Sequence, residues 1–319
     1  MMQSLWKGES AIFAGCNQAR LLVPARSIER VYNAVTGEEF DIGRDYVWQE
    51  GSDTIGRTES SRITFLSDAE LHPENAVYYP DPNANAVPNG GKNNIRFDAK
   101  LFFAEHQFEI DYTPLDSELP SAFHRPERVP HFRRMVSLGD SITEGYNASA
   151  FIGRAPFRKQ YARLVADAVG AELFNLGVNG VPSAYWREVR EQAVGFAPDL
   201  ITIAYGMNDL SELTAAQYVA EIAQATEYFH KACPHARIVL VSAMSGNPEW
   251  NCTPAAKSQA FADALRKYAR KNGFTFADVY SVWSYAVSKK GFFALTGNGV
   301  NHPNDYGHRL YAMTILNSF

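Results

Sequence analysis

The sequence predicts an α/β fold with a parallel sheet, preceded by a smaller all-β domain of the jelly-roll type. Up to about residue 125, runs rich in β-branched and aromatic residues, such as SRITFL and NNIRFDAKLFFAEHQFEIDYT, alternate with turn-forming clusters, and no helical stretch stands out. From about residue 133, apolar strand-like segments alternate with amphipathic helical segments. Between the two, residues 112–130 carry four prolines, which disfavour both helix and central strand. We therefore predict two domains, residues 1–128 and residues 129–319.

Five strand candidates follow this connector. In order along the chain they are RMVSL, AELFNL, DLITIAYG, ARIVLVSA and FTFADVY. The intervening stretches place apolar residues at helical spacing, as Tyr218, Ile222, Ala225 and Phe229 do. Because alternating strands and helices build a parallel sheet covered on both faces, we expect a five-stranded sheet in a three-layer α/β/α sandwich.

Composition and charge narrow the class of protein. The chain has 319 residues, of which 46% are hydrophobic and 20% charged, and its net charge is −5. No concentrated basic patch indicates a nucleic-acid partner, and no run approaches the roughly 18 apolar residues of a membrane span. The N-terminal MMQSLWKGESAIFAG does not follow a signal-peptide plan. We therefore expect a cytoplasmic protein without a membrane partner, with a signal peptide removed beforehand as the alternative.

The three cysteines, Cys16, Cys233 and Cys252, are odd in number and widely spaced. This pattern favours neither a disulfide framework nor a zinc cluster. Free thiols fit a reducing compartment, which agrees with the cytoplasmic expectation.

Four loops are expected at one edge of the predicted sheet, because parallel strands all end on the same side and ligands bind there. These loops are residues 139–147, 177–183 and 206–210 and the segment before the last helix. Ser141 lies in the first, within SLGDSITEGYN. A serine there can combine a nucleophilic hydroxyl with the backbone N–H groups of the next helix. The alternative is that Asp140 or Ser141 only caps that helix.

The other three loops favour the catalytic interpretation of Ser141. Gly180, in NLGVNG, lets the backbone approach a substrate closely, and Asn208, in YGMND, can donate an amide N–H to a developing oxyanion. His302 precedes a proline and can reach over the edge as a general base. His308, six residues later, is expected to be structural. Glycine and asparagine are also ordinary turn residues, so neither loop alone indicates a catalytic site. The catalytic interpretation of Ser141 depends on all four loops together.

The four ordered blocks GDSIT, NLGVNG, YGMND and NHPNDYGH resemble the SGNH hydrolases, the GDSL-like lipases and esterases, over roughly residues 133–319. The resemblance implies a flavodoxin-like fold and ester hydrolysis through an acyl-enzyme on Ser141. It implies that the N–H groups of Ser141 and Gly180 and the Asn208 side chain form an oxyanion hole, and that His302 is the base. Such chemistry needs no metal and no organic cofactor. The G-x-S-x-G motif of the α/β-hydrolases is absent.

The sequence departs from this family at one position. An aspartate commonly lies three residues before the catalytic histidine, but here the residue is Gly299, and no carboxylate lies in the loop before the histidine. A backbone carbonyl or Asn298 could orient the ring in a Ser–His dyad, a carboxylate such as Asp278 or one from the N-terminal domain could take over, or the enzyme could be weak or inactive. We favour the dyad. We expect Asp140 to shape the turn at Ser141 and Asp305 to cap the last helix.

The N-terminal domain bears on the substrate. An all-β module ahead of an SGNH domain is similar to the arrangement in a group of acetylxylan esterases, members of which can also lack the acid. This resemblance implies a small-molecule or oligosaccharide ester as substrate and the removal of acetyl groups from carbohydrate. Trp186 and Trp250 flank the predicted edge and are candidates for lining the cleft.

Two rival functions remain open at this point. A lipase or thioesterase for longer chains would need an apolar acyl channel, and no long apolar loop at the predicted edge provides one. A carbohydrate-binding protein with a decayed site would keep the fold and lose the activity.

Overall fold

The computed structural model describes residues 5–115, 123, 126 and 128–319. Five parallel strands form the main sheet, in the spatial order β12-β11-β13-β14-β15. Their bounds are β11 Arg134–Gly139, β12 Glu172–Gly177, β13 Leu200–Ala204, β14 Arg237–Val241 and β15 Thr275–Ala277. The predicted five-stranded parallel sheet is confirmed.

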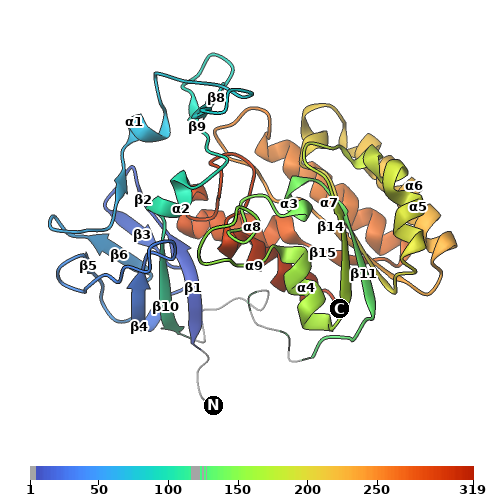
Figure 1. Ribbon diagram of the computed structural model, residues 1–319, viewed down its shortest axis with the longest axis horizontal. Helices are drawn as coiled ribbons and strands as arrows, with labels where there is room; N and C mark the ends of the chain where they lie inside the picture. Colours follow the sequence, from blue (N-terminus) through green and yellow to red (C-terminus); the bar gives the residue numbers. More distant parts are fainter. Residues whose placement is uncertain (1–4, 116–122, 124–125, 127) are drawn as a thin grey trace.

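Helices cover both faces of this sheet (Figure 1). α4, α8 and α9 pack together on one face, and α5, α6 and α7 pack together on the other. Their bounds are α3 Ser141–Glu144, α4 Tyr161–Val169, α5 Trp186–Gly195, α6 Ala215–Ala232, α7 Ala255–Asn272, α8 Val279–Lys290 and α9 Asp305–Leu316. Short 3₁₀ turns lie at η3 Ser183–Tyr185, η4 Asn208–Ser211 and η5 Phe292–Ala294. The predicted three-layer α/β/α sandwich is therefore confirmed.

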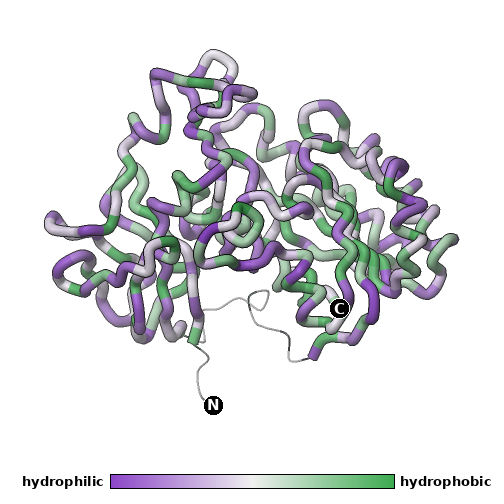
Figure 2. Tube along the Cα trace, viewed as in Figure 1, coloured by the Kyte–Doolittle hydropathy of each residue, from purple (hydrophilic) through white to green (hydrophobic). Residues whose placement is uncertain are grey.

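The central strands lie in the core because they are apolar throughout. All five residues of β13 are buried, as a strand covered by helices on both faces requires. Figure 2 shows hydrophobic residues along the strands of the sheet and more hydrophilic residues along the outer helices α5 and α6. The helix that the spacing of Tyr218, Ile222 and Phe229 predicted is α6, with these side chains buried.

The N-terminal region, by which we mean residues 5–115, consists mainly of β strands in small sheets. An antiparallel sheet has the order β1-β10-β4, and the other strands form sheets of two or three. The bounds are β1 Trp6–Ala11, β2 Phe13–Ala14, β3 Gln18–Arg20, β4 Ala25–Tyr32, β5 Tyr46–Val47, β6 Thr54–Arg57, β7 Phe65–Leu66, β8 Ala86–Val87, β9 Ile95–Arg96 and β10 Phe108–Pro114.

Two short helices correct the expectation that this region is entirely β. They are α1 Asp68–Leu71 and α2 Phe102–His106. A capping box of Ser67 and Glu70 opens α1. The aromatic run that suggested a strand around Phe102 forms α2 because Phe103 turns inward and stacks on Phe293 of the α/β region. Most of the predicted proline-rich connector, residues 116–122, 124, 125 and 127, lies outside the described residues.

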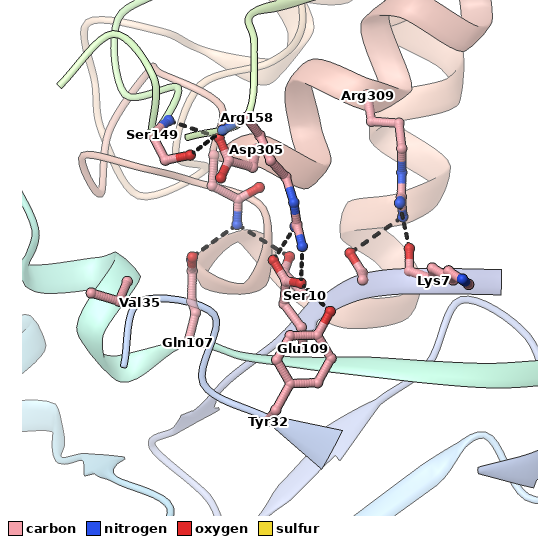
Figure 3. A network of polar contacts seen from close by, with 12 residues as sticks. Lys7, Ser10, Tyr32, Val35, Gln107, Glu109, Ser149, Arg158, Asp305 and Arg309 are labelled. Atoms are coloured by element: carbon pink, nitrogen blue, oxygen red, sulfur yellow. Dashed lines mark hydrogen bonds and ion pairs between the residues drawn. The ribbon is translucent and has the colours of Figure 1, made fainter. Parts of the chain in front are cut away.

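Polar contacts join the N-terminal region to the helices beside the main sheet (Figure 3). The Arg158 guanidinium contacts both carboxylate oxygens of Glu109 on β10, at 2.6 Å between Nη2 and Oε2. The Tyr32 hydroxyl donates to the same carboxylate at 2.8 Å. Asp305 accepts the backbone N–H of Ser149 at 2.8 Å. The ion pair between the buried Glu109 and the partly exposed Arg158 therefore joins the two parts, while the other two hydrogen bonds lie within one part each.

A second ion pair lies deeper at the same junction. Lys290, at the end of α8, and Glu9, on β1, pair with both side chains fully buried. Glu9 also accepts the backbone N–H of Leu22 and the hydroxyl of Tyr112, each at 2.7 Å. Because these hydrogen bonds satisfy the carboxylate, the pair is tolerated in the interior.

Within the described ranges, no helix combines the length and apolar character that crossing a lipid bilayer requires.

Candidate active site

Ser141 lies at the carboxyl end of β11, at the first position of α3. Asp140 caps this short helix by accepting the N–H of Ile142 at 3.0 Å, as the sequence predicted. A Cβ on Gly139 would lie 1.9 Å from the hydroxyl oxygen of Thr143, and one on Gly177 would lie 2.3 Å from the backbone of the same turn. The turn that carries Ser141 can therefore lie on the ends of β11 and β12 only because both residues are glycine.

His302 lies beside Ser141, although 161 residues separate them in sequence. Its Nε2 is 2.9 Å from Ser141 Oγ. Both side chains are buried, with 3% of Ser141 and 9% of His302 exposed. Burial lowers the pKa of His302 to about 3, and the nearby His308 adds to the shift. The ring is therefore neutral at physiological pH and can accept the serine proton.

The other ring nitrogen contacts a residue that sequence reasoning missed. His302 Nδ1 lies 2.8 Å from Oδ1 of Asn147, in the loop after α3. The prediction that Asn298 orients the ring is wrong, because its Oδ1 accepts the backbone N–H groups of Val300, Asn301 and His302 instead. Asn298 thus stabilises the backbone of the histidine loop, and Asn147 contacts the ring.

The carboxylates considered for this role lie elsewhere. Asp278 caps α8 and pairs with Arg266. Asp305 accepts the backbone N–H of Ser149, while Asn304, rather than the expected Asp305, caps α9. The ring of His302 therefore meets a neutral amide where the family commonly has an acid. The sequence offered one signal for this role of Asn147. Asparagine tolerates left-handed backbone, and this one stands at the end of the Ser141 loop.

Gly180 and Asn208 lie in neighbouring loops after β12 and β13. The Asn208 side-chain amide donates to the carbonyl of Val181 at 3.0 Å, and its second N–H can serve another acceptor. The buried Asp209 accepts both the backbone N–H and the hydroxyl of Ser183. Side chains of one loop therefore hold the other in place, and burial raises the pKa of Asp209.

His308 is structural, as expected. Its Nε2 lies 3.1 Å from the carbonyl of Tyr146, and its Nδ1 lies 3.5 Å from the backbone nitrogen of Tyr161. Burial lowers the pKa of His308 to about 4, so this ring is also neutral. Its contacts hold the loop that follows α3 against the start of α4.

A pocket of about 590 Å³ opens beside His302. Residues 79–85 and 97–100 of the N-terminal region form one wall, and Tyr146, Asn179 and His302 form the other. The size falls within the range usual for small-molecule sites. The N-terminal region therefore borders the space next to the candidate base.

The two tryptophans expected at the cleft lie in other places. Trp186 is buried in the core, where its ring packs against Tyr228 and Phe229, so the prediction that it lines the cleft is wrong. Trp250 lies half-buried in the loop after β14, and its role in binding stays a prediction. Among the described residues, no group of three or more His, Cys, Asp or Glu side chains could hold a metal ion.

The fold and the serine–histidine pair define an α/β/α sandwich protein with a hydrolase-type site at the carboxyl edge of its sheet. The sequence profile of the GDSL-like Lipase/Acylhydrolase family matches residues 137–310, more than half of the chain. The chain therefore belongs to this family and is a carboxylic-ester hydrolase. The family resemblance that the four sequence blocks indicated is confirmed.

Several solved structures are similar to part of the chain. A GDSL-like lipase from Parabacteroides merdae ATCC 43184 is 21% identical, with 60% of this chain and 97% of that chain covered and a TM-score of 0.49. The acetylxylan esterase Axe2 from Geobacillus stearothermophilus is 18% identical, with 60% and 95% covered and a TM-score of 0.49. A lipolytic G-D-S-L family protein from Veillonella parvula DSM 2008 is 19% identical, with 59% and 98% covered and a TM-score of 0.48. No curated protein matches the chain.

Proposed function

We propose that the protein is a serine esterase that removes short acyl groups, acetyl in particular, from carbohydrate hydroxyls. Ser141 is the nucleophile and His302 the general base. The observation that carries this proposal is the 2.9 Å contact between Ser141 Oγ and His302 Nε2. In this geometry the ring can take the hydroxyl proton as the serine oxygen attacks an ester carbonyl.

The reaction runs in two halves. As Ser141 Oγ bonds to the carbonyl carbon, its proton moves to His302 Nε2, and the oxyanion accepts hydrogen bonds from the N–H groups of Ser141 and Gly180 and the amide of Asn208. The bond to the sugar oxygen then breaks, and His302 returns the proton to that oxygen. Water, giving a proton to His302, attacks the acyl-enzyme, which releases the carboxylic acid and restores Ser141. No step needs a metal or an organic cofactor.

The loops around Gly180 and Asn208 support their role in the oxyanion hole. Gly180 has a φ of +76°, and no heavy atom lies within 4 Å of where a Cβ would stand, so a substrate can approach its backbone. Asn208 is tied to Val181, next to Gly180 in the chain. Donors that are fixed before the reaction stabilise a developing charge without reorganisation.

The pocket beside His302 supports a carbohydrate as the alcohol part of the ester. Tyr79, which is 80% exposed, lies in its wall beside Asp81, Asn83 and Asp98. An exposed aromatic ring can pack on the apolar face of a sugar, while carboxylates and amides accept hydrogen bonds from its hydroxyls.

The division into domains at residues 128 and 129 is part of the same proposal. The N-terminal domain, residues 1–128, supplies the wall of the pocket, and residues 129–319 supply the catalytic groups. The separate antiparallel sheet β1-β10-β4 supports this division.

The test compares p-nitrophenyl acetate, butyrate and octanoate with a panel of acetylated saccharides. We expect the acetyl esters to be preferred, and Ser141→Ala to lose at least about 10³-fold in kcat. Ser288→Ala, an exposed serine on α8, is the matched control and should keep full activity.

Two outcomes would contradict the proposal. A preference for octanoate would indicate a lipase or thioesterase. Equal inactivity of the wild type and Ser141→Ala on every acetyl ester would indicate a carbohydrate-binding protein with a decayed site.

A further inference from the structure

The N-terminal region occupies the place where the family commonly has its acid. Gly299 stands three residues before His302, with a φ of +89°. A Cβ there would lie 2.2 Å from the carbonyl oxygen of Arg96 and 2.7 Å from the Phe103 ring. The first of these neighbours is backbone, which cannot rotate away. No side chain fits at position 299 while residues 96–103 pack against it, so an aspartate cannot stand there.

The same segment helps to orient the residue that meets the ring instead. Asn147 Nδ2 lies 3.3 Å from the carbonyl oxygen of Gly297 and 3.5 Å from that of Ala99. Two carbonyl oxygens accept hydrogen bonds only, so the NH₂ end of the amide faces them and the amide oxygen faces His302. The reverse orientation would place three acceptor oxygens together.

This orientation fixes the tautomer of the histidine. Because the Asn147 amide oxygen can only accept, His302 Nδ1 must carry the hydrogen across the 2.8 Å contact. The lone pair of Nε2 is then left for the Ser141 proton. Asn147 itself adopts a left-handed φ of +62°, which asparagine tolerates, and Gly297 leaves room for its Cβ, since a Cβ on Gly297 would lie only 2.4 Å away.

We propose that Asn147 positions the ring of His302 in this esterase and so takes the role of the family's acid. The backbone carbonyls of Gly297 and of Ala99, which lies in the N-terminal region, fix the orientation of the Asn147 amide. This inference rests on the proposed roles of Ser141 and His302. A neutral amide fixes the ring tautomer without placing a charge in a buried site. It stabilises the imidazolium less than a carboxylate does, since it offers a dipole in place of a full charge.

The test uses two variants of Asn147 in the full chain. Asn147→Gly removes the amide and suits the left-handed backbone, and we expect kcat to fall about 10²- to 10³-fold with little change in KM, because a wrong tautomer costs up to about 10⁴-fold in a serine protease. Asn147→Asp keeps an acceptor for Nδ1 but sets its second carboxylate oxygen against the carbonyl oxygens of Gly297 and Ala99, so we expect it to retain more activity than Asn147→Gly and less than wild type.

The pH profile separates positioning from a structural role. Among the described residues, His308 and Tyr146 lie beside the His302 ring, and Asp81, Asp98 and Lys100 line the same pocket. The negative charge of Asn147→Asp favours the protonated ring, so the acid limb of kcat/KM should move up by at least about one pH unit. Asn247→Gly, which removes another buried amide that contacts the histidine loop, should leave that limb unchanged.

Wild-type kcat in Asn147→Gly, or an unmoved acid limb in Asn147→Asp, would overturn the proposal. Should Asn147→Gly fail to fold, the profile of Asn147→Asp still decides. Ser141→Ala separates this failure from that of the proposed function. An inactive Ser141→Ala with fully active Asn147→Gly refutes only the positioning role, whereas an active Ser141→Ala refutes the serine mechanism itself.

Discussion

Replacing Gly299 by alanine tests directly whether the N-terminal region fills the space of the missing acid. Two effects add in Gly299→Ala. A non-glycine residue in left-handed backbone costs about 1–2 kcal/mol. The added Cβ, 2.2 Å from the Arg96 carbonyl oxygen, forces the two chain segments apart, and overpacking of this kind costs a further 1–3 kcal/mol or so. We expect the free energy of unfolding to fall by about 2–5 kcal/mol in total.

Gly43→Ala provides the matched control for this experiment. Gly43 has a φ of +85°, close to that of Gly299, but no heavy atom lies within 4 Å of where its Cβ would stand. It therefore carries the backbone cost alone. Urea unfolding of wild type and both variants, followed by tryptophan fluorescence, gives the difference between them. If Gly299→Ala is no less stable than Gly43→Ala, the N-terminal segment does not crowd position 299, and our explanation for the absent aspartate is refuted.

Three further predictions concern buried titratable groups. Burial lowers the pKa of His302 to about 3, so kcat/KM, measured by acetate release, should stay constant from pH 8 down to pH 5; a half-maximum near 6.5 would contradict this. Burial raises the pKa of Asp140 to about 7, so the folded chain keeps a proton that the unfolded chain releases above pH 4. The stability that this carboxyl contributes is then lost as the pH rises to 7. In urea unfolding, the free energy of unfolding of Asp140→Asn should therefore rise by about 3 kcal/mol relative to that of wild type between pH 5 and pH 8. A difference that does not change with pH would refute the assignment. Arg158→Met leaves the buried Glu109 without its ion-pair partner and should lower the free energy of unfolding by about 3 kcal/mol. The exposed control Arg133→Met should lower it by less than about 1 kcal/mol. Equal losses would show that the Arg158–Glu109 pair does not stabilise the fold.

The sequence predicted the α/β region well because its signals are local. Apolar strands and helices of the right spacing fix the sheet, and the ends of parallel strands bring Ser141, Gly180, Asn208 and the loop of His302 to one edge. The chemistry of these residue types then suggests their roles. None of this required knowledge of how distant segments pack.

The errors concern contacts that the local pattern does not contain. Asn147 faces His302 because its backbone is left-handed and two carbonyls turn its amide, and neither fact is visible in the residue order. Asn298 was the nearer candidate in sequence, but its oxygen is already used by the backbone of its own loop. Trp186 looked accessible because it follows an edge loop, yet helix α5 turns it into the core.

Residues 97–100 border the pocket and also supply, through Ala99, a carbonyl to the Asn147 amide beside His302, the candidate base. In most enzymes a designer can exchange a specificity loop and keep the catalytic groups intact. Here a graft that shifts the main chain at Ala99 would also release Asn147. If Asn147 positions His302 as we propose, substrate range and turnover vary together, and a new loop must reproduce the path of the old backbone before its side chains matter.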